Sequence, residues 1–584
     1  MIFRRIFLIF RNWIIDLFIL HLLILYNNKN ETAPDILCGA VFEVFISRRK
    51  DMLTIEAKPV SCTHTAMEDF WAREDIILVV PGSLPCIRGV YLRARAEGKL
   101  NQFAYVHMEE MDYVMGTAED RIRDAVRETV KKGEKWGAVI IYLSCLDILT
   151  RLDFSDLEKS LTKETGCTVR CFFRGPMAAA DGISHLTAAQ MTAAIPRAEP
   201  VKKQVCQLPP PVSDGSGISD WKQSPDTQTW MLTPPGCRSC MRDGDMSEGQ
   251  KKVYAVRMKA ADFIYGMEER CAAQIQEREE GKETQRVLIQ TAVPAFIGLD
   301  HEAVMKQIHQ KNKDDIFFPS DGFHDAMSGI SRAEEIQAQT DASFFSESGT
   351  RVIRVLGYSP LLCGHIEDFH PCTERIKAMG YEVCYSGRDS KESQKRPALN
   401  WVVSSAGLKA ALWMKNELEI PFTTFLPIGE FLMSQWEQCM KALLPCGGNS
   451  GDACKEGMTE IESQRTGRRL LLMGDPVHTR NMELFLQGKG KYSISRAAYS
   501  WSKESEALYR SGESGGGMHY FKTLDEWRAL AENADVVAAD PVFHMNIPGI
   551  LWISFYWGYA GGQYSCCPGR GIMGRLLYRD LESL

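Results

Sequence analysis

The sequence predicts an α/β protein built from several Rossmann-like parallel-sheet blocks, the first two of which are related by internal duplication. Three observations lead to this prediction. Apolar strand patterns alternate with amphipathic helix patterns, the strands are continuous apolar runs, and one irregular phrase occurs twice. Such alternation is typical of parallel sheets that are covered by helices on both faces. The 584 residues are 45% hydrophobic and 24% charged, which allows large buried cores.

The first block shows the alternation clearly. The strand DIILVV (75–80) runs into a tight turn that ends at Cys86, and a helix is predicted over 117–133. A second strand, AVIIYL (138–143), leads into Cys145, and another helix follows it. Later blocks repeat the pattern with strands that begin near residues 351, 398, 468 and 534.

The repeated phrase is YVHMEEMDYVMG (105–116), which has a close likeness in YAVRMKAADFIYG (254–266). Each copy follows a strand and a turn that ends in a cysteine, Cys86 in the first and Cys237 in the second, and each precedes helix, strand and helix. Because the neighbourhoods match as well, the likeness indicates duplication of a β/α unit. The entrances also agree, with a cysteine in KPVSC (58–62) and another in KQVC (203–206).

These patterns divide the chain into six parts: an N-terminal hydrophobic extension (1–51), a first α/β domain (52–197), a linker rich in Pro, Ser and Gly (198–227), a duplicated α/β domain (228–346), a third α/β domain (347–462) and a C-terminal α/β domain (463–584). The linker composition predicts a segment that crosses the surface.

The N-terminal extension has two interpretations. Residues 1–26 are apolar but are interrupted by Asp16 and His21, so the clean stretch is short for a membrane span. No cleavage site follows, and the composition changes near Met52, so 1–51 is either a mis-called start or an anchor. We expect a cytoplasmic protein whose 18 scattered cysteines are reduced thiols, with membrane anchoring as the less favoured alternative. No basic stripe is present, which excludes nucleic acid as a partner.

The motifs, taken in order, resemble the nitrogenase component 1 family. That family includes the component 1 subunits, their cofactor-assembly scaffold relatives and the dark-operative protochlorophyllide reductase subunits. The resemblance runs from about Met52 to Leu584 and rests on these stretches: the Gly turn ending in Cys86, VIIYLSC, VLGYSP, ALNWVVSSAGLKAALWMKNELEIPF, RRLLLMGDPVHTRNMELFL and ADVVAADPVF. It implies a fold of nitrogenase component 1 type.

The resemblance also implies an iron–sulfur cluster, of [4Fe–4S] or related type, on three cysteines of the first domain. Cys62, Cys86 and Cys145 match these positions, at separations of 24 and 59 residues. Without the resemblance, three buried thiols at strand ends would be the plainer interpretation. A cluster takes four ligands, and the family draws the fourth from a partner subunit. Here the second copy offers Cys237 or Cys206, while Val293 stands where Cys145 would have its counterpart.

In function, the resemblance implies an oxidoreductase component that carries out electron transfer. It would accept electrons from a separate iron-protein ATPase and would form a homodimer or pair with a similar component 1-like subunit. Nitrogenase holds its active-site metal cluster with a Cys and a His, where this chain has Ser404 and Phe555, so dinitrogen fixation is not expected. The alternative is a non-catalytic scaffold for assembly or transfer of a metal cluster. The sequence identifies neither the substrate nor the catalytic residues.

Overall fold

The computed structural model describes residues 64–131, 136–150, 154–174, 178, 185–199, 207–224, 227–234, 237, 253–256, 262–277, 285–308, 315–345, 351–389, 394–444, 467–487, 492–511, 517–547, 549–562 and 569–583. The chain divides into two compact units, Met1–Lys58 with Arg95–Gly98, and Pro59–Ala94 with Lys99–Leu584. The predictions for residues 1–51, Cys62 and Cys206 lie outside the described residues. In the described part of the chain, no helix has the length and apolar character that crossing a membrane requires.

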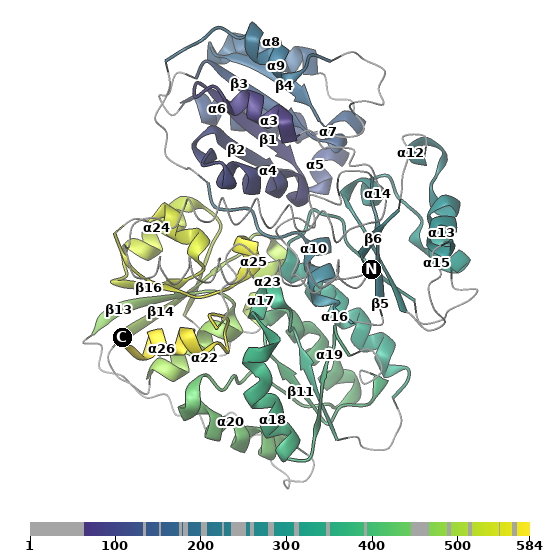
Figure 1. The fold of residues 1–584 in the computed structure, drawn as a ribbon, viewed down its shortest axis with the longest axis vertical. Helices are drawn as coiled ribbons and strands as arrows, with labels where there is room; N and C mark the ends of the chain where they lie inside the picture. The colour runs from purple at the N-terminus through teal and green to yellow at the C-terminus, as the bar shows by residue number, and fades with distance from the viewer. Residues whose placement is uncertain are drawn as a thin grey trace, which may run out of the picture. The chain divides into compact units, whose positions relative to one another are not determined.

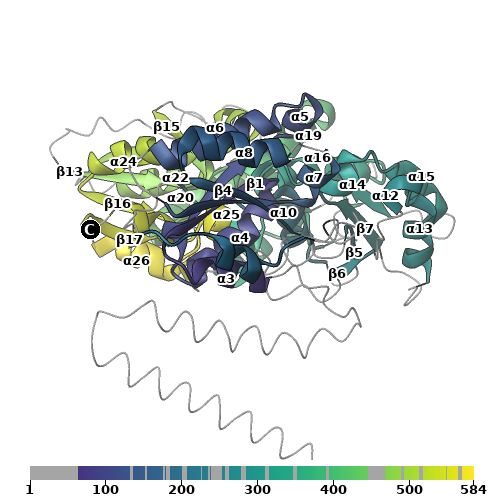
Figure 2. The same cartoon turned by 90° about the horizontal axis from the view of Figure 1, so that it is seen from above.

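The first sheet has four parallel strands in the order β2-β1-β3-β4. Its strands are β1 (Ile76–Gly82), β2 (Phe103–His107), β3 (Ala138–Leu143) and β4 (Thr168–Phe173). One face packs against α6 (Ala118–Lys131) and α8 (Phe154–Thr165), and the other against α3 (His64–Trp71), α4 (Leu84–Ala96) and α9 (Ala188–Ala194). Figure 1 shows this block at the top of the view, and Figure 2 shows β1 and β4 between α6 and α8 on one side and α3 and α4 on the other. Burial on both faces explains why β1 and β3 are apolar throughout.

The second sheet repeats this layout, with the order β6-β5-β7-β8 and all strands parallel. Its strands are β5 (Thr227–Leu232), β6 (Val253–Ala255), β7 (Gln285–Gln290) and β8 (Ile316–Phe318). Helices α13 (Glu268–Gln276) and α15 (His301–Ile308) cover one face, and α10 (Asp214–Trp221) and α16 (Ala326–Ala342) cover the other.

The third and fourth sheets are also parallel, in the orders β10-β9-β11-β12 and β15-β14-β13-β16-β17. The strands are β9 (Val352–Leu356), β10 (Glu382–Tyr385), β11 (Leu399–Val402), β12 (Phe422–Thr423), β13 (Arg468–Met473), β14 (Tyr492–Tyr499), β15 (Met518–Phe521), β16 (Val536–Ala539) and β17 (Leu551–Ser554). The accompanying helices include α18 (His370–Ala378), α19 (Leu408–Leu418), α20 (Gly429–Leu443), α22 (Pro476–Gln487), α23 (Lys503–Ser511), α24 (Leu524–Glu532) and α26 (Arg575–Ser583). The predicted α/β fold with several parallel sheets is confirmed.

The described residues of the two phrases have similar local structure. Each contains an edge strand, β2 or β6, followed by a short helix, α5 (Glu110–Val114) or α12 (Asp262–Tyr265). Each ends at a glycine with positive φ, +74° at Gly116 and +91° at Gly266. However, the third sheet shares the strand order of the first two, so the order alone does not distinguish duplication from repeated use of one topology. The internal duplication stays a prediction.

Most of the described residues of the predicted surface linker (198–227) are buried. Residues 208–222 are buried and contain α10, every residue of which is buried. The Gly and Ser residues that made this stretch resemble a linker allow α10 to pack closely on α16. A Cβ built on Gly217 would lie 2.7 Å from the Cβ of Ala326, and one on Gly329 would lie 2.6 Å from the Cα of Asp214. Small residues here serve close helix packing rather than chain flexibility.

Candidate functional site

Two cysteines lie at one edge of the first sheet. Strand β1 ends at Gly82, and Cys86 is the third residue of α4. Strand β3 ends at Leu143, and Cys145 is the first residue of α7 (Cys145–Leu149). Because β1 and β3 are parallel neighbours, their carboxyl ends meet at the same edge, where α/β sheets bind ligands.

Gly82 allows the two turns to approach each other. Its φ is +140°, a conformation that side-chain-bearing residues rarely adopt. A Cβ at this position would lie 3.3 Å from the Cβ of Cys86 and 3.4 Å from the Oγ of Ser144. The turn after β1 therefore depends on glycine both for its backbone angle and for space.

Cys86, Cys145 and Cys237 line one small cavity, which is open to solvent on one side. Cys237 comes from the loop that follows β5, where its N–H donates to the carbonyl of Pro234 (3.3 Å). Cys145 is buried, and the other two thiols are half-buried. Thus three of the five predicted site cysteines, from two different sheets, converge on the same cavity.

The residue of the second block that matches Cys145 is not a cysteine. Strands β3 and β7 each span six residues and are followed by a helix N-cap, Ser144 before α7 and Thr291 before α14 (Ala292–Phe296). By this match Ala292, rather than Val293, stands at the position of Cys145, and both Ala292 and Val293 line the cavity. The sequence comparison placed this counterpart one residue too late because it had no strand end to anchor on. At either residue the second block has no cysteine.

A buried carboxyl group supports the turn that holds Cys145. Asp147 is fully buried and accepts hydrogen bonds from the N–H and the hydroxyl of Ser144, at 2.6 and 2.7 Å, and from the hydroxyl of Tyr113, at 3.0 Å. Burial raises the pKa of Asp147. Tyr113 belongs to the repeated phrase and also packs against the rings of Phe296 and Phe323. The phrase therefore packs beside the cysteine cavity.

The sequence analysis did not identify Arg174, which follows directly after β4. Its Nη2 donates to the carbonyl oxygen of Cys86 (3.2 Å), and its guanidinium lies 4.9 Å above the ring of Tyr142. One feature that indicates a role for Arg174 is its position directly after β4, because β4 ends at the same edge of the sheet as β1 and β3.

The donor set fits an iron–sulfur group. Thiolates are the ligands that such clusters require, and strand-end turns hold them at fixed positions. Among the described residues that line the cavity, none is a carboxylate or an imidazole, the ligands that would favour harder metal ions. The remaining wall is formed by small polar and apolar side chains, so the site combines soft donors with a largely apolar surrounding.

Ser404 and Phe555 lie in well-packed surroundings in the third and fourth blocks. Both are fully buried, and Ser404 donates a hydrogen bond to the carbonyl of Gly357 (2.6 Å). The ring of Phe555 lies 6.1 Å from the imidazole of His478 and would be 2.7 Å from a Cβ on Gly474. Neither residue offers a thiolate or an imidazole, and protein atoms surround both.

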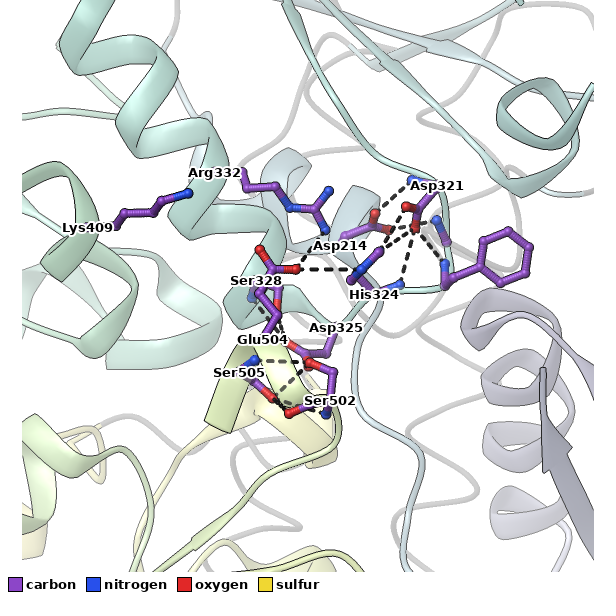
Figure 3. A network of polar contacts seen from close by, with 12 residues as sticks. Asp214, Asp321, His324, Asp325, Ser328, Arg332, Lys409, Ser502, Glu504 and Ser505 are labelled. Atoms are coloured by element: carbon purple, nitrogen blue, oxygen red, sulfur yellow. Dashed lines mark hydrogen bonds and ion pairs between the residues drawn. The ribbon is translucent and has the colours of Figure 1, made fainter. Parts of the chain in front are cut away.

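A cluster of polar side chains, which we call the polar bridge, joins the loop after β8 to α23 (Figure 3). The carboxylate of Asp321 bonds to Nδ1 of His324 (2.8 Å), while Nε2 of His324 lies 3.6 Å from Glu504. Asp214 accepts the N–H groups of Asp321 (2.7 Å) and Gly322 (3.0 Å). The carbonyl of Gly322 in turn accepts the N–H of Leu84, at the start of the helix that carries Cys86. This polar bridge thus fixes a loop that touches the cysteine helix.

Ligand atoms of Asp214, Asp321 and His324 lie within 4.8 Å of one another, which is close enough for a metal ion. However, Arg332 also faces the cluster, with its Nη2 3.5 Å from Glu504. The guanidinium and the imidazole compensate the carboxylates without a metal ion. We therefore interpret the polar bridge as a set of ion pairs and hydrogen bonds rather than as a metal site.

The polar bridge predicts a pH dependence of stability. The hydrogen bond to Asp321 raises the pKa of His324, which is also faced by Asp214, Glu504, Arg332 and His107. Burial alone would raise the pKa of Asp321, but its bond to His324 holds that pKa at about 2.

We expect the stabilisation from His324 to be complete below about pH 6.5, the usual pKa of an unfolded histidine, and to be lost as pH rises through the higher folded-state pKa. Since His324 is partly exposed, the effect should stay within about 1 kcal/mol. Thermal melting of the parent and a His324→Gln variant from pH 5 to 9 measures it. The two melting curves should differ most at low pH, and an equal difference at every pH would contradict this assignment.

Comparison with known proteins identifies the family of this chain. The sequence model of the nitrogenase component 1 type oxidoreductases matches residues 221–536, more than half of the chain. A search among curated proteins found no match. Two solved structures that match are described as "Nitrogenase Cp1 at pH 6.5" (13% identity, TM-score 0.45, covering 66% of this chain and 94% of that one) and "Nitrogenase Cp1 at pH 5" (14%, 0.46, 65% and 91%).

This chain therefore belongs to the nitrogenase component 1 type oxidoreductase family. The matched region contains Cys237 but begins after Cys86 and Cys145. The assignment of those two cysteines consequently rests on the cavity that they share with Cys237.

Proposed function

We propose that the chain is a nitrogenase-like oxidoreductase component with a [4Fe–4S] or related cluster in the cysteine cavity. Cys86 and Cys145 would be ligands, joined by Cys62. The component would accept electrons from a separate ATP-hydrolysing iron protein and reduce a substrate that the residues do not identify. The observation that carries the proposal is the convergence of three thiols, distant in sequence, on one cavity.

Cys237 is the better candidate for the fourth ligand. It shares the cavity with Cys86 and Cys145, whereas Cys206 lies outside the described residues. In the family as the resemblance describes it, a partner subunit supplies this ligand. Here a second block of the same chain would do so, which makes the cluster independent of dimer formation.

We expect Cys237→Ala to lose iron to a chelator faster than the parent, because removal of one ligand leaves three thiolates, which hold a cluster less tightly. Iron release to an iron(II) chelator, followed anaerobically by absorbance, measures this. Cys271→Ala, which removes a buried thiol of the same block away from the cavity, is the control. Parent-like release from Cys237→Ala, together with rapid release from Cys206→Ala, would assign the fourth ligand to Cys206.

The electron-transfer role is tested with the full chain and an iron protein. With ATP and a reductant, the cluster signal in the electron paramagnetic resonance spectrum should change, and it should not change when ATP is omitted. No ATP-binding P-loop sequence occurs in this chain, so we expect the nucleotide dependence to come from the iron protein. An ATP-independent signal, or none, would contradict the proposed electron donor.

A scaffold for metal-cluster assembly or transfer is the second candidate. The packed surroundings of Ser404 and Phe555 favour it, because the family's active-site ligands are missing there. Two measurements distinguish the two functions. Transfer of iron and sulfide to an apo-acceptor protein without substrate turnover supports the scaffold, while reductant-dependent turnover with the iron protein supports the enzyme.

A further inference from the structure

The cationic side chain of Arg174 bonds directly to the backbone of a cysteine of the cavity. Strand β4 ends at Phe173, so Arg174 starts at the same edge of the sheet as the turns that carry Cys86 and Cys145. From β4 its side chain passes over the ring of Tyr142, a residue of the neighbouring strand β3, and reaches the backbone of Cys86. The guanidinium thus lies beside the backbone of the helix that carries Cys86, although Arg174 is not among the residues that line the cavity.

The distance from this charge to the sulfur is limited by covalent geometry. Nη2 lies 3.2 Å from the carbonyl oxygen of Cys86. Since the carbonyl oxygen and sulfur of one cysteine lie within about 5 Å of each other, the charge is within about 8 Å of that sulfur. At this range in a partly buried site, a unit charge acts strongly on another charge.

Its placement is fixed rather than flexible. The guanidinium lies over the ring of Tyr142, which is 2% exposed, and donates to a main-chain oxygen of a helix. Arg174 is thus a fixed positive charge close to cysteines that would be negatively charged thiolates as cluster ligands.

We propose that Arg174 sets the reduction potential of the cysteine site. This inference rests on the proposed function. When the site accepts one electron, its charge becomes one unit more negative, and no bond is formed or broken in the protein. A fixed guanidinium stabilises the reduced state more than the oxidised state, so it raises the potential. Arg174 acts through the field at the cysteines and is a positioning residue, not a catalytic one.

The test is a redox titration of the anaerobically purified full chain, followed by electron paramagnetic resonance, with iron content measured on the same samples. Arg174→Gln should retain iron and shift the potential to a more negative value. Arg174→Lys keeps the charge and should lie between Arg174→Gln and the parent. Arg170→Gln is the matched control, because it removes the same charge from an exposed position on the same strand, and it should match the parent.

An unchanged potential in an iron-loaded Arg174→Gln variant would overturn the inference while leaving the proposed function intact. If Arg174→Gln does not retain iron, Arg174→Met, which keeps an aliphatic stem over Tyr142, replaces it with the same expectations. Loss of iron in both neutral variants would also overturn it, because Arg174 would then be needed for binding rather than for the potential. A parent chain without iron would instead refute the proposed function.

Discussion

Cys86→Ala and Cys145→Ala are each expected to remove most of the iron and acid-labile sulfide from anaerobically purified protein. Each substitution deletes a thiolate from a cavity whose described walls provide no other soft ligand than the remaining cysteines. Because loss of even an outer-shell partner of a metal ligand costs about 10- to 100-fold in affinity, loss of the ligand itself should cost more than about 100-fold. Iron and sulfide assays on equal amounts of folded protein measure the effect.

Cys171→Ala provides the matched control. Cys171 is a buried thiol on β4 in the same block, and it packs in the core that also contains Cys145. The control should keep the iron content of the parent, with only a modest loss of stability from the smaller side chain. Equal iron in the parent, Cys86→Ala and Cys145→Ala would remove the basis of both the enzyme and the scaffold.

Gly217→Ala and Gly329→Ala are expected to destabilise the fold strongly. Each is a helical glycine at the crossing of α10 and α16, where a new Cβ would lie 2.8 Å from the Cα of Ala326 or 2.6 Å from the Cα of Asp214. Backbone atoms cannot move aside as a flexible side chain can. We therefore expect a loss of about 2–3 kcal/mol in the free energy of unfolding for each variant, typical of an overpacked core.

The direction of the stability change distinguishes a buried helix from a surface linker. At an exposed helix position, Gly→Ala stabilises a protein by about 1 kcal/mol because alanine favours the helix. If residues 208–222 were a surface linker, both variants would be neutral or stabilising. Denaturant unfolding of the variants decides between the two outcomes. Gln339→Ala, at an exposed position of α16, should change stability by less than about 0.5 kcal/mol.

The local features of the fold were accessible from the sequence. Strands β1 and β3 are continuous apolar runs because both sheet faces are covered, and this pattern needs no knowledge of distant residues. The same reasoning placed Cys86, Cys145 and Cys237 at strand ends, and the structure brings these three to one cavity.

The features that the sequence analysis missed depend on distant contacts. The buried α10 was misjudged because its Gly and Ser residues have the composition of a linker, and only the contact with α16, more than 100 residues later, explains them. Arg174 lies 88 residues from Cys86, and no local pattern marks that hydrogen bond. Asp147 stands two residues after Cys145, but its importance follows from complete burial, which one sequence does not reveal.

Mössbauer spectroscopy of the full chain, labelled with ⁵⁷Fe and purified without oxygen, examines the cysteine cavity itself. We expect the spectrum of an iron–sulfur cluster with about four irons per chain, and its loss in the Cys86→Ala variant. A spectrum that contains only adventitious mononuclear iron, or no iron, would contradict the assignment of the cavity as a cluster site. The family membership would then remain without the proposed redox function.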